Sequence, residues 1–221
     1  MTAMDRWNEA LRTLPLVAIL RGIRPEEAIA VGEALVEAGF KVLEVPLNSP
    51  DPFDSIKALT STMGERAVVG AGTVLSVADV EILKAVGGQI CISPNANPDV
   101  IRRAKALGLI SLPAFFTATE AFIAMEAGAD ALKLFPAELA GVTGLKALKA
   151  VLPKNLPVLP VGGIDPDGMK AYRDAGAAGF GIGSAVYKPG DTPERVYVKA
   201  KAFTDAWARI GDQTSLRGRG F

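Results

Sequence analysis

The apolar positions of this chain fall into short runs rich in β-branched residues, which alternate with longer stretches whose apolar residues recur at helical spacing. The alternation predicts eight strands, each followed by a helix, and one further helix near the N-terminus at about residues 4–13. The predicted strands cover residues 16–20, 41–45, 67–72, 89–93, 109–114, 129–135, 157–163 and 179–184.

Residues at the ends of the helical stretches support these boundaries. Side chains that cap helix N-termini stand where several helices are expected to start, at Ser76, Asn97, Thr117 and Asp165. Glycine readily adopts the left-handed backbone conformation that ends a helix. It stands shortly before several predicted strands, at Gly39, Gly87, Gly108, Gly128 and Gly176.

Parallel strands with crossover helices in this number predict an α/β fold, a (β/α)8 TIM barrel with an extra N-terminal helix. The alternative, a doubly wound open sheet, needs five or six strands and would leave units unplaced. Because no linker interrupts the pattern, residues 1–214 are expected to form a single domain. The basic, glycine-containing tail, 215–221, is expected to be disordered.

Composition excludes several classes of partner. The formal net charge is zero, whereas a nucleic-acid-binding protein normally carries a basic patch. No apolar run approaches the roughly 18 residues of a membrane span, and the first ten residues contain no signal-peptide core. The single cysteine, Cys91, lies mid-strand and is expected to be a small core residue. These features predict a cytoplasmic protein with no membrane or nucleic-acid partner.

The chain contains no histidine. Histidine-dependent nucleophiles and histidine metal sites are therefore impossible within it, and any general base must be Asp, Glu, Lys, Tyr or the one Cys. In a barrel of this kind, catalytic groups lie at the C-terminal ends of the strands and in the loops that follow. The candidate groups at these ends are Arg21, Glu44, Thr73, Ser93, Asn95, Pro113, Lys133, Gly162, Gly163, Gly183 and Ser184.

Strand alternation predicts that a lysine and a glutamate share the barrel interior. Lys133 is flanked by leucines within 132–134, and Glu44 is flanked by Leu43 and Val45. The apolar flanking residues should face the helices, so that the two charged side chains point inward from strands 6 and 2. A purely structural ion pair is one interpretation, although such pairs contribute weakly to stability. The favoured interpretation is a nucleophilic Lys133, since an amine buried near a cation such as Arg21 tends to lose its proton.

Glycine-rich turns after the last two predicted strands suggest an anion site. Gly162–Gly163 and Gly183–Ser184 each precede a predicted helix, and they offer backbone N–H groups that large side chains do not obstruct. Barrels of this class often bind phosphate at this place, although tight turns alone would also explain the glycines. Asp165 and Asp167 are expected to cap the next helix rather than to bind a metal.

Together these groups suggest a substrate with a 2-oxo acid head and a phosphorylated tail. A neutral lysine attacks a ketone to form a Schiff base, which acts as an electron sink for carbon–carbon cleavage. Glu44 would move protons, Arg21 would hold a carboxylate, and the glycine turns would hold phosphate. The expected products are pyruvate and a phosphorylated aldehyde, and this chemistry requires no metal or other cofactor.

The chain resembles the bacterial family of 2-dehydro-3-deoxy-6-phosphogluconate and 2-dehydro-3-deoxy-6-phosphogalactonate aldolases. The matching motifs occur in family order and span most of the barrel: VAILRG (17–22), LEVPLNSP (43–50), GAGTV (70–74), SPN (93–95), LKLFPA (132–137), PVGGI (160–164) and GIGSA (181–185). The resemblance implies a homotrimer without a cofactor. It also implies a role for each site residue: Lys133 as the Schiff-base lysine, Glu44 as acid and base, Arg21, Thr73 and Pro113 as pyruvate-binding residues, and Gly162, Gly163, Gly183 and Ser184 as phosphate-binding residues.

Two departures from the gluconate branch favour the galactonate branch. The gluconate branch tends to carry arginine where this chain has Asn48, and threonine where this chain has Val161. These positions are predicted to set the preference between the two substrates, which differ in one hydroxyl configuration at C4. The alternatives are a gluconate-specific or dual-epimer aldolase, a phosphosugar isomerase or epimerase on the same barrel, and a non-catalytic phosphosugar-binding protein.

Overall fold

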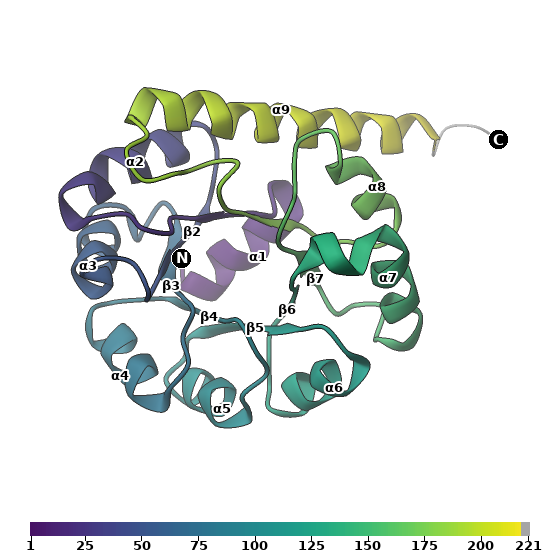
Figure 1. Ribbon diagram of the computed structural model, residues 1–221, viewed down its shortest axis with the longest axis horizontal. Helices are drawn as coiled ribbons and strands as arrows, with labels where there is room; N and C mark the ends of the chain where they lie inside the picture. The colour runs from purple at the N-terminus through teal and green to yellow at the C-terminus, as the bar shows by residue number, and fades with distance from the viewer. Residues whose placement is uncertain (218–221) are drawn as a thin grey trace.

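Eight parallel strands form a nearly closed barrel surrounded by helices in the computed structural model, which describes residues 1–217 (Figure 1). The strands are hydrogen-bonded in the order β7-β6-β5-β4-β3-β2-β1-β8. A parallel bridge between Val161 and Gly181 then joins the two ends of this series. The predicted (β/α)8 barrel is therefore confirmed, and the doubly wound open sheet is excluded.

The strands begin and end close to the predicted runs. They are β1 (Leu16–Ile19), β2 (Val42–Pro46), β3 (Val68–Gly72), β4 (Ile90–Ser93), β5 (Ile110–Phe115), β6 (Leu132–Leu134), β7 (Val158–Pro160) and β8 (Phe180–Ile182). The helices in the described part of the chain are α1 (Ala3–Thr13), α2 (Pro25–Glu37), α3 (Pro52–Met63), α4 (Val77–Ala85), α5 (Pro98–Ala106), α6 (Ala118–Glu126), α7 (Ala137–Val151), α8 (Met169–Asp174) and α9 (Pro193–Arg217). None of these helices combines the length and hydrophobicity needed to cross a bilayer.

The predicted helix caps are confirmed with one exception. The side chains of Ser76, Asn97 and Thr117 each accept a hydrogen bond from a backbone N–H in the first turn of α4, α5 and α6. Asp165 does not cap α8, because that helix starts only at Met169. Its carboxylate instead accepts the N–H of Gly168 at 2.7 Å and closes the turn that precedes the helix.

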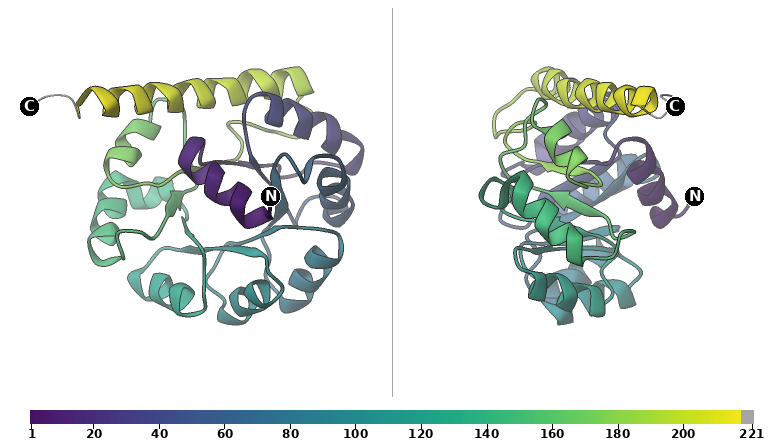
Figure 2. Two further views of the ribbon diagram at one scale, coloured as in Figure 1. Left: turned by 180° about the vertical axis from the view of Figure 1, so that it is seen from behind. Right: turned by 90° about the vertical axis from the view of Figure 1, so that its right-hand side faces the viewer.

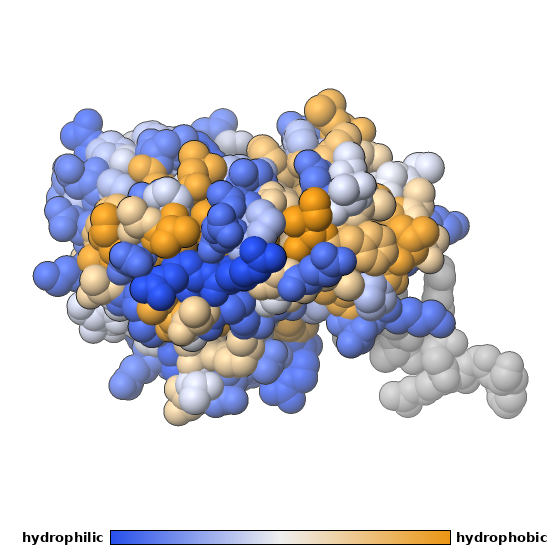
Figure 3. Space-filling view, turned by 90° about the horizontal axis from the view of Figure 1, so that it is seen from below, coloured by the Kyte–Doolittle hydropathy of each residue, from blue (hydrophilic) through white to orange (hydrophobic). Residues whose placement is uncertain are grey.

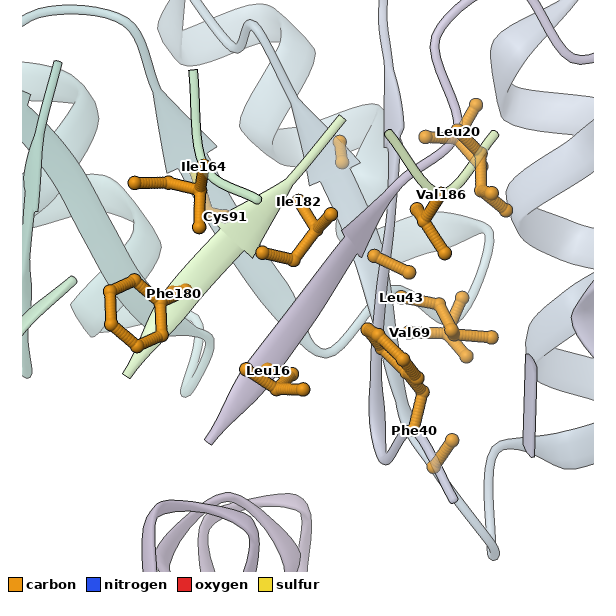
Figure 4. Packing of buried hydrophobic residues seen from close by; sticks show 14 of the residues in the cluster. Leu16, Leu20, Phe40, Leu43, Val69, Cys91, Ile164, Phe180, Ile182 and Val186 are labelled. Carbon is orange, nitrogen blue, oxygen red and sulfur yellow. The ribbon is translucent and has the colours of Figure 1, made fainter. Parts of the chain in front are cut away.

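Strand alternation divides the apolar core into two layers. The outer layer packs the strands against the surrounding helices and includes Leu132 and Leu134. Figure 4 shows other members of this layer, among them Leu43 and Val69. The free Cys91 is buried in this layer, as predicted for a small core residue. The inner layer fills the barrel itself, with Val42 among its members.

Helix α1 covers the N-terminal end of the barrel. Figure 2 shows it lying across the barrel in the view from behind. Trp7 of α1 is 2% exposed and packs against the inner layer of the core. Helix α1 and Trp7 therefore cover the barrel interior at this end.

Helix α9 runs along one side of the barrel beside α2 (Figure 1). It continues through Arg217, so residues 215–217 are helical, although the sequence analysis assigned them to a disordered tail. The rest of that predicted tail, 218–221, lies outside the described residues.

Candidate active site

Lys133 and Glu44 line one small cavity inside the barrel. Their side chains are buried, with residue exposures of 5% and 1%. The cavity has a volume of about 10 Å³. Its lining consists of Val17, Ile19, Glu44, Ile92, Leu112, Lys133, Leu159, Val161 and Gly181. Strand alternation therefore brings the two ionisable groups together in apolar surroundings, as the sequence predicts.

Burial dominates the electrostatics of Glu44. It raises the pKa of the Glu44 carboxyl above its ordinary value of 4.5, while the positive charges of Lys133 and Arg21 lower that pKa by a smaller amount. The Oε1 atom of Glu44 is buried and has no hydrogen-bond partner among the described residues. An unpartnered carboxyl oxygen at this position is available to a water molecule or to a substrate hydroxyl.

A larger cavity of about 510 Å³ adjoins this pair at the C-terminal end of the barrel. The two cavities share Ile19, Val161 and Gly181 as lining residues. The larger one is lined by Ile19, Arg21, Gly22, Phe135, Val161, Gly162, Gly163, Ile164, Gly181, Gly183, Ser184, Ala185, Tyr187, Lys188 and Pro189. A substrate bound in the larger cavity would therefore lie directly above Lys133 and Glu44.

The lining of the larger cavity has a positive character. Arg21 and Lys188 are the charged side chains among its described lining residues, and no carboxylate lines it. Gly162 and Gly163 have φ angles of +108° and +66°, which favour glycine. A Cβ atom at Gly163 would also lie 2.8 Å from Oε2 of Glu138, which packs against this turn. The glycines that the sequence marked as a phosphate site therefore form a constrained turn in the cavity wall.

Asn48 contacts Arg21 and does not line the cavity itself. Its Oδ1 accepts a hydrogen bond from Nη1 of Arg21 at 2.5 Å, and Asn48 is not itself part of the cavity lining. The next residue, Ser49, accepts the N–H of Gly22 on its Oγ at 2.9 Å. Residues 48–49 therefore hold both the side chain of Arg21 and the turn that carries it.

Thr73 and Pro113 lie outside the lining of both cavities as the described residues define them. Thr73 follows β3 and has a φ of +59°, an uncommon value for a β-branched residue. Pro113 is buried in β5. Each is adjacent in sequence to a residue that touches Glu44 or Lys133, because Gly72 packs against Glu44 and Ala114 pairs with Lys133.

Gly72 leaves space that the Glu44 carboxyl occupies. A Cβ atom at this position would lie 2.4 Å from Oε1 of Glu44 and 2.8 Å from its Cδ.

The Gly72→Ala variant is therefore expected to displace the carboxyl and to lower kcat by about 10-fold or more, since misplacement of a catalytic group by about 1 Å can cost about 100-fold. Steady-state kinetics measure the effect. The matched control is Gly211→Ala, where a Cβ atom meets nothing within 4 Å and activity should be unchanged. Equal activities of the two variants would contradict this role of Gly72.

Sequence reasoning did not assign a role to residues 187–189. Tyr187, Lys188 and Pro189 line the larger cavity at its edge. The signal that could have indicated them is their position, because they follow Gly183–Ser184 in the loop after the last strand.

These observations define a class of protein: a TIM barrel in which a buried lysine and a buried carboxyl group lie beside a cavity whose charged lining residues, among those described, are cations. The family model described as "Aldolase: KDPG and KHG aldolase" matches residues 7–195. The chain belongs to this family.

Comparison with individual proteins gives the same result. The chain is 48% identical over 194 residues to the 2-dehydro-3-deoxy-6-phosphogalactonate aldolase of Escherichia coli (strain K12), covering 88% of this chain and 95% of that protein. It is 34% identical over 175 residues to the KHG/KDPG aldolase of the same organism, covering 76% and 81%. A solved structure described as "Native KDPGal structure" matches with a TM-score of 0.89 and 47% identity, covering 90% of this chain and 97% of that one.

Proposed function

We propose that this chain is a class I aldolase that cleaves 2-dehydro-3-deoxy-6-phosphogalactonate to pyruvate and glyceraldehyde 3-phosphate. The observation that carries the proposal is the burial of Lys133 with Glu44 at the base of a cavity lined by cations and glycines. Family membership supports the aldolase reaction, and the 48% identical relative, whose name specifies the galactonate substrate, supports that substrate.

In the proposed mechanism, Lys133 is the nucleophile. Its neutral amine attacks the C2 ketone to give a carbinolamine, which loses water to form an iminium ion. The C4 hydroxyl then loses its proton and the C3–C4 bond breaks, with its electron pair moving into the iminium to give an enamine. Glyceraldehyde 3-phosphate leaves at this point. Protonation of the enamine at C3 and hydrolysis of the resulting iminium release pyruvate and regenerate the amine.

Glu44 is the proposed general acid and base. The reaction needs a group that can both accept and donate protons beside the Schiff base, and the chain has no histidine to do so. A buried carboxyl with a raised pKa suits this role because both of its protonation states are accessible nearer to neutral pH. The unpartnered Oε1 atom supports a direct or water-mediated contact with the reacting hydroxyl.

The proposed substrate pose extends from the inner cavity to the glycine turns. Arg21, held by Asn48, would bind the carboxylate of the 2-oxo acid, and Thr73 and Pro113 would contact the pyruvate part. The backbone N–H groups of Gly162, Gly163 and Gly183, with the Ser184 hydroxyl, would bind the phosphate. The positive character of the cavity lining supports a substrate with an anion at each end.

Two residues are proposed to favour the galactonate epimer. Val161 lines both cavities and therefore lies between the proposed Schiff base and the phosphate turns, near the expected position of C4. Asn48 sets the position of Arg21 by its hydrogen bond, so its influence on specificity would be indirect.

The test of this function compares kcat/KM for cleavage of the two C4 epimers under identical conditions, with pyruvate release as the readout. We expect a preference for 2-dehydro-3-deoxy-6-phosphogalactonate of roughly 10-fold or more, the effect of about one polar or apolar contact difference. Equal rates or a gluconate preference would contradict the epimer assignment. Interconversion of sugar phosphates without pyruvate release would favour an isomerase or epimerase instead.

The proposed oligomer is a homotrimer. Exposed apolar side chains on α4, α6 and the loops before them could be covered by another copy of the chain. They are Leu75, Val77, Ile82, Phe116, Phe122 and Ile123. Figure 3 shows apolar patches among polar ones on the side of the barrel that carries these helices. Sedimentation equilibrium measures the number of subunits, and a stable monomer would contradict the proposal.

A further inference from the structure

Residues 187–189 form a fixed lip at the edge of the larger cavity. The Tyr187 side chain is 2% exposed, and its hydroxyl donates a hydrogen bond to Oε2 of Glu27 at 3.1 Å. Pro189 packs against the turn that carries Arg21, since a Cβ atom at Gly22 would lie 2.7 Å from its Cγ. The backbone on either side of Lys188 is therefore attached to neighbouring parts of the barrel.

The backbone of Lys188 is also held from the side of α9. Its N–H donates to Oδ2 of Asp191 at 2.8 Å. The Asp191 carboxylate in turn pairs with Lys199 at 2.5 Å and with Arg195 at 3.2 Å. Because two other cations already pair with this carboxylate, Asp191 fixes the backbone of the lip without neutralising the side chain of Lys188.

The ammonium group of Lys188 forms no hydrogen bond or ion pair with any part of the chain that the structure describes. It is exposed and lines a cavity whose described lining includes no carboxylate. An exposed lysine without a partner is common on a protein surface. A lysine on a fixed backbone at the edge of a cavity is less common, and it is well suited to bind an anion that enters the cavity.

The position of Lys188 relative to the glycine turns indicates which anion it would bind. The N–H groups of Val186 and Tyr187 donate to the carbonyl of Gly183 at 2.9 and 3.1 Å, so a single backbone turn connects the Gly183–Ser184 segment to the lip. Arg21, by contrast, acts electrostatically on Glu44 at the catalytic end of the cavity. Arg21 therefore acts near Glu44, whereas Lys188 is connected by one backbone turn to the proposed phosphate site.

We propose that Lys188 binds the phosphate monoester of the substrate and thereby selects phosphorylated over unphosphorylated aldehydes. The inference rests on the proposed aldolase function and adds a charged side chain to a phosphate site otherwise built from backbone N–H groups and a serine. It also offers a second source of positive charge in a chain that has Asn48 where the gluconate branch tends to carry arginine.

The test uses the condensation direction, in which the two substrates carry different anions. Pyruvate carries only a carboxylate, glyceraldehyde 3-phosphate carries the phosphate, and glyceraldehyde carries neither. Lys188→Ala is expected to raise the KM for glyceraldehyde 3-phosphate by roughly 10- to 100-fold, the usual effect of losing a hydrogen bond to a charged group. The KM for pyruvate and the kcat/KM for glyceraldehyde should change by less than about 2-fold.

Two further variants separate charge from structure. Lys188→Arg should restore most of the affinity for glyceraldehyde 3-phosphate because it keeps the charge. Lys84→Ala, which removes an exposed lysine from the last turn of α4, should leave all three parameters unchanged.

Three results would overturn the role of Lys188. They are an unchanged KM for glyceraldehyde 3-phosphate, an increased KM for pyruvate alone, or an equal loss with both aldehydes in Lys188→Ala. Failure of the wild-type protein to condense pyruvate with either aldehyde would instead contradict the aldolase function itself.

Discussion

Replacement of Lys133 by alanine is expected to abolish cleavage of 2-dehydro-3-deoxy-6-phosphogalactonate, with kcat lower by roughly 10⁴-fold or more, as for other covalent nucleophiles. Without the amine no iminium forms, and the electron pair of the C3–C4 bond has no sink. Pyruvate release, followed with a coupled assay, measures the loss. No other lysine lines the inner cavity in the described part of the chain, so no neighbouring amine is available to replace it.

Lys133→Met is the control for packing. Lys133 is 5% exposed and surrounded by apolar side chains, so alanine leaves unfilled space whereas methionine fills most of it. Methionine leaves Glu44 without its neighbouring cation, as alanine does, but it fills the space, so we expect Lys133→Met to be the more thermally stable of the two variants. Both variants should be inactive. Retention of a substantial fraction of wild-type turnover by either variant would contradict the assignment of Lys133.

Replacement of Glu44 by glutamine should slow turnover by roughly 10²–10⁴-fold, the usual contribution of a general acid–base group. Glutamine keeps the shape of the side chain in its buried site but can neither accept nor donate the proton. The Schiff base with pyruvate should still form, although more slowly. Single-turnover kinetics separate the two steps, and Glu37→Gln on the exposed surface of α2 is the matched control. Near-normal turnover of Glu44→Gln would assign proton transfer to another group.

The raised pKa of the Glu44 carboxyl predicts how activity and thermal stability change with pH. Since burial raises the pKa of Glu44, the base form appears only above the ordinary value of 4.5, and the acid limb of kcat/KM should lie above that pH. A pKa that is raised in the folded state also affects the free energy of unfolding. The stabilising contribution of Glu44 to this free energy is fully present below pH 4.5, and it is lost as the pH rises through the pKa of the folded state. Glu44→Gln should therefore remove the acid limb and gain thermal stability relative to the wild type as the pH rises.

The barrel, and the burial of Lys133 with Glu44 inside it, could be predicted because both follow from local rules. Successive side chains of a strand point to opposite faces of the sheet. Because the apolar residues that flank Lys133 and Glu44 face the helices, these two side chains must face the barrel interior. Glycines at helix ends indicated where the next strands begin. The number of strand–helix units predicted that the sheet closes into a barrel. These features depend on residues close together in the sequence.

The features that the sequence did not reveal depend on contacts between distant segments. The hydrogen bond from Arg21 to Asn48 joins loops that are 27 residues apart, and it changes Asn48 from a residue expected near the substrate to one that positions Arg21. The proposed role of Lys188 rests on the hydrogen bond from its backbone N–H to Asp191 and on the packing of Pro189 against Gly22. Helix α8 begins later than predicted because the carboxylate of Asp165 is used in the preceding turn.

The most direct test of the central claim is to trap the Schiff base. Incubation of the wild-type protein with pyruvate and sodium borohydride, followed by peptide mass spectrometry, identifies the modified residue. Formation of a reduced pyruvate adduct on Lys133, and its absence in Lys133→Met, is the predicted result. The absence of an adduct, or an adduct on a different lysine, would contradict it.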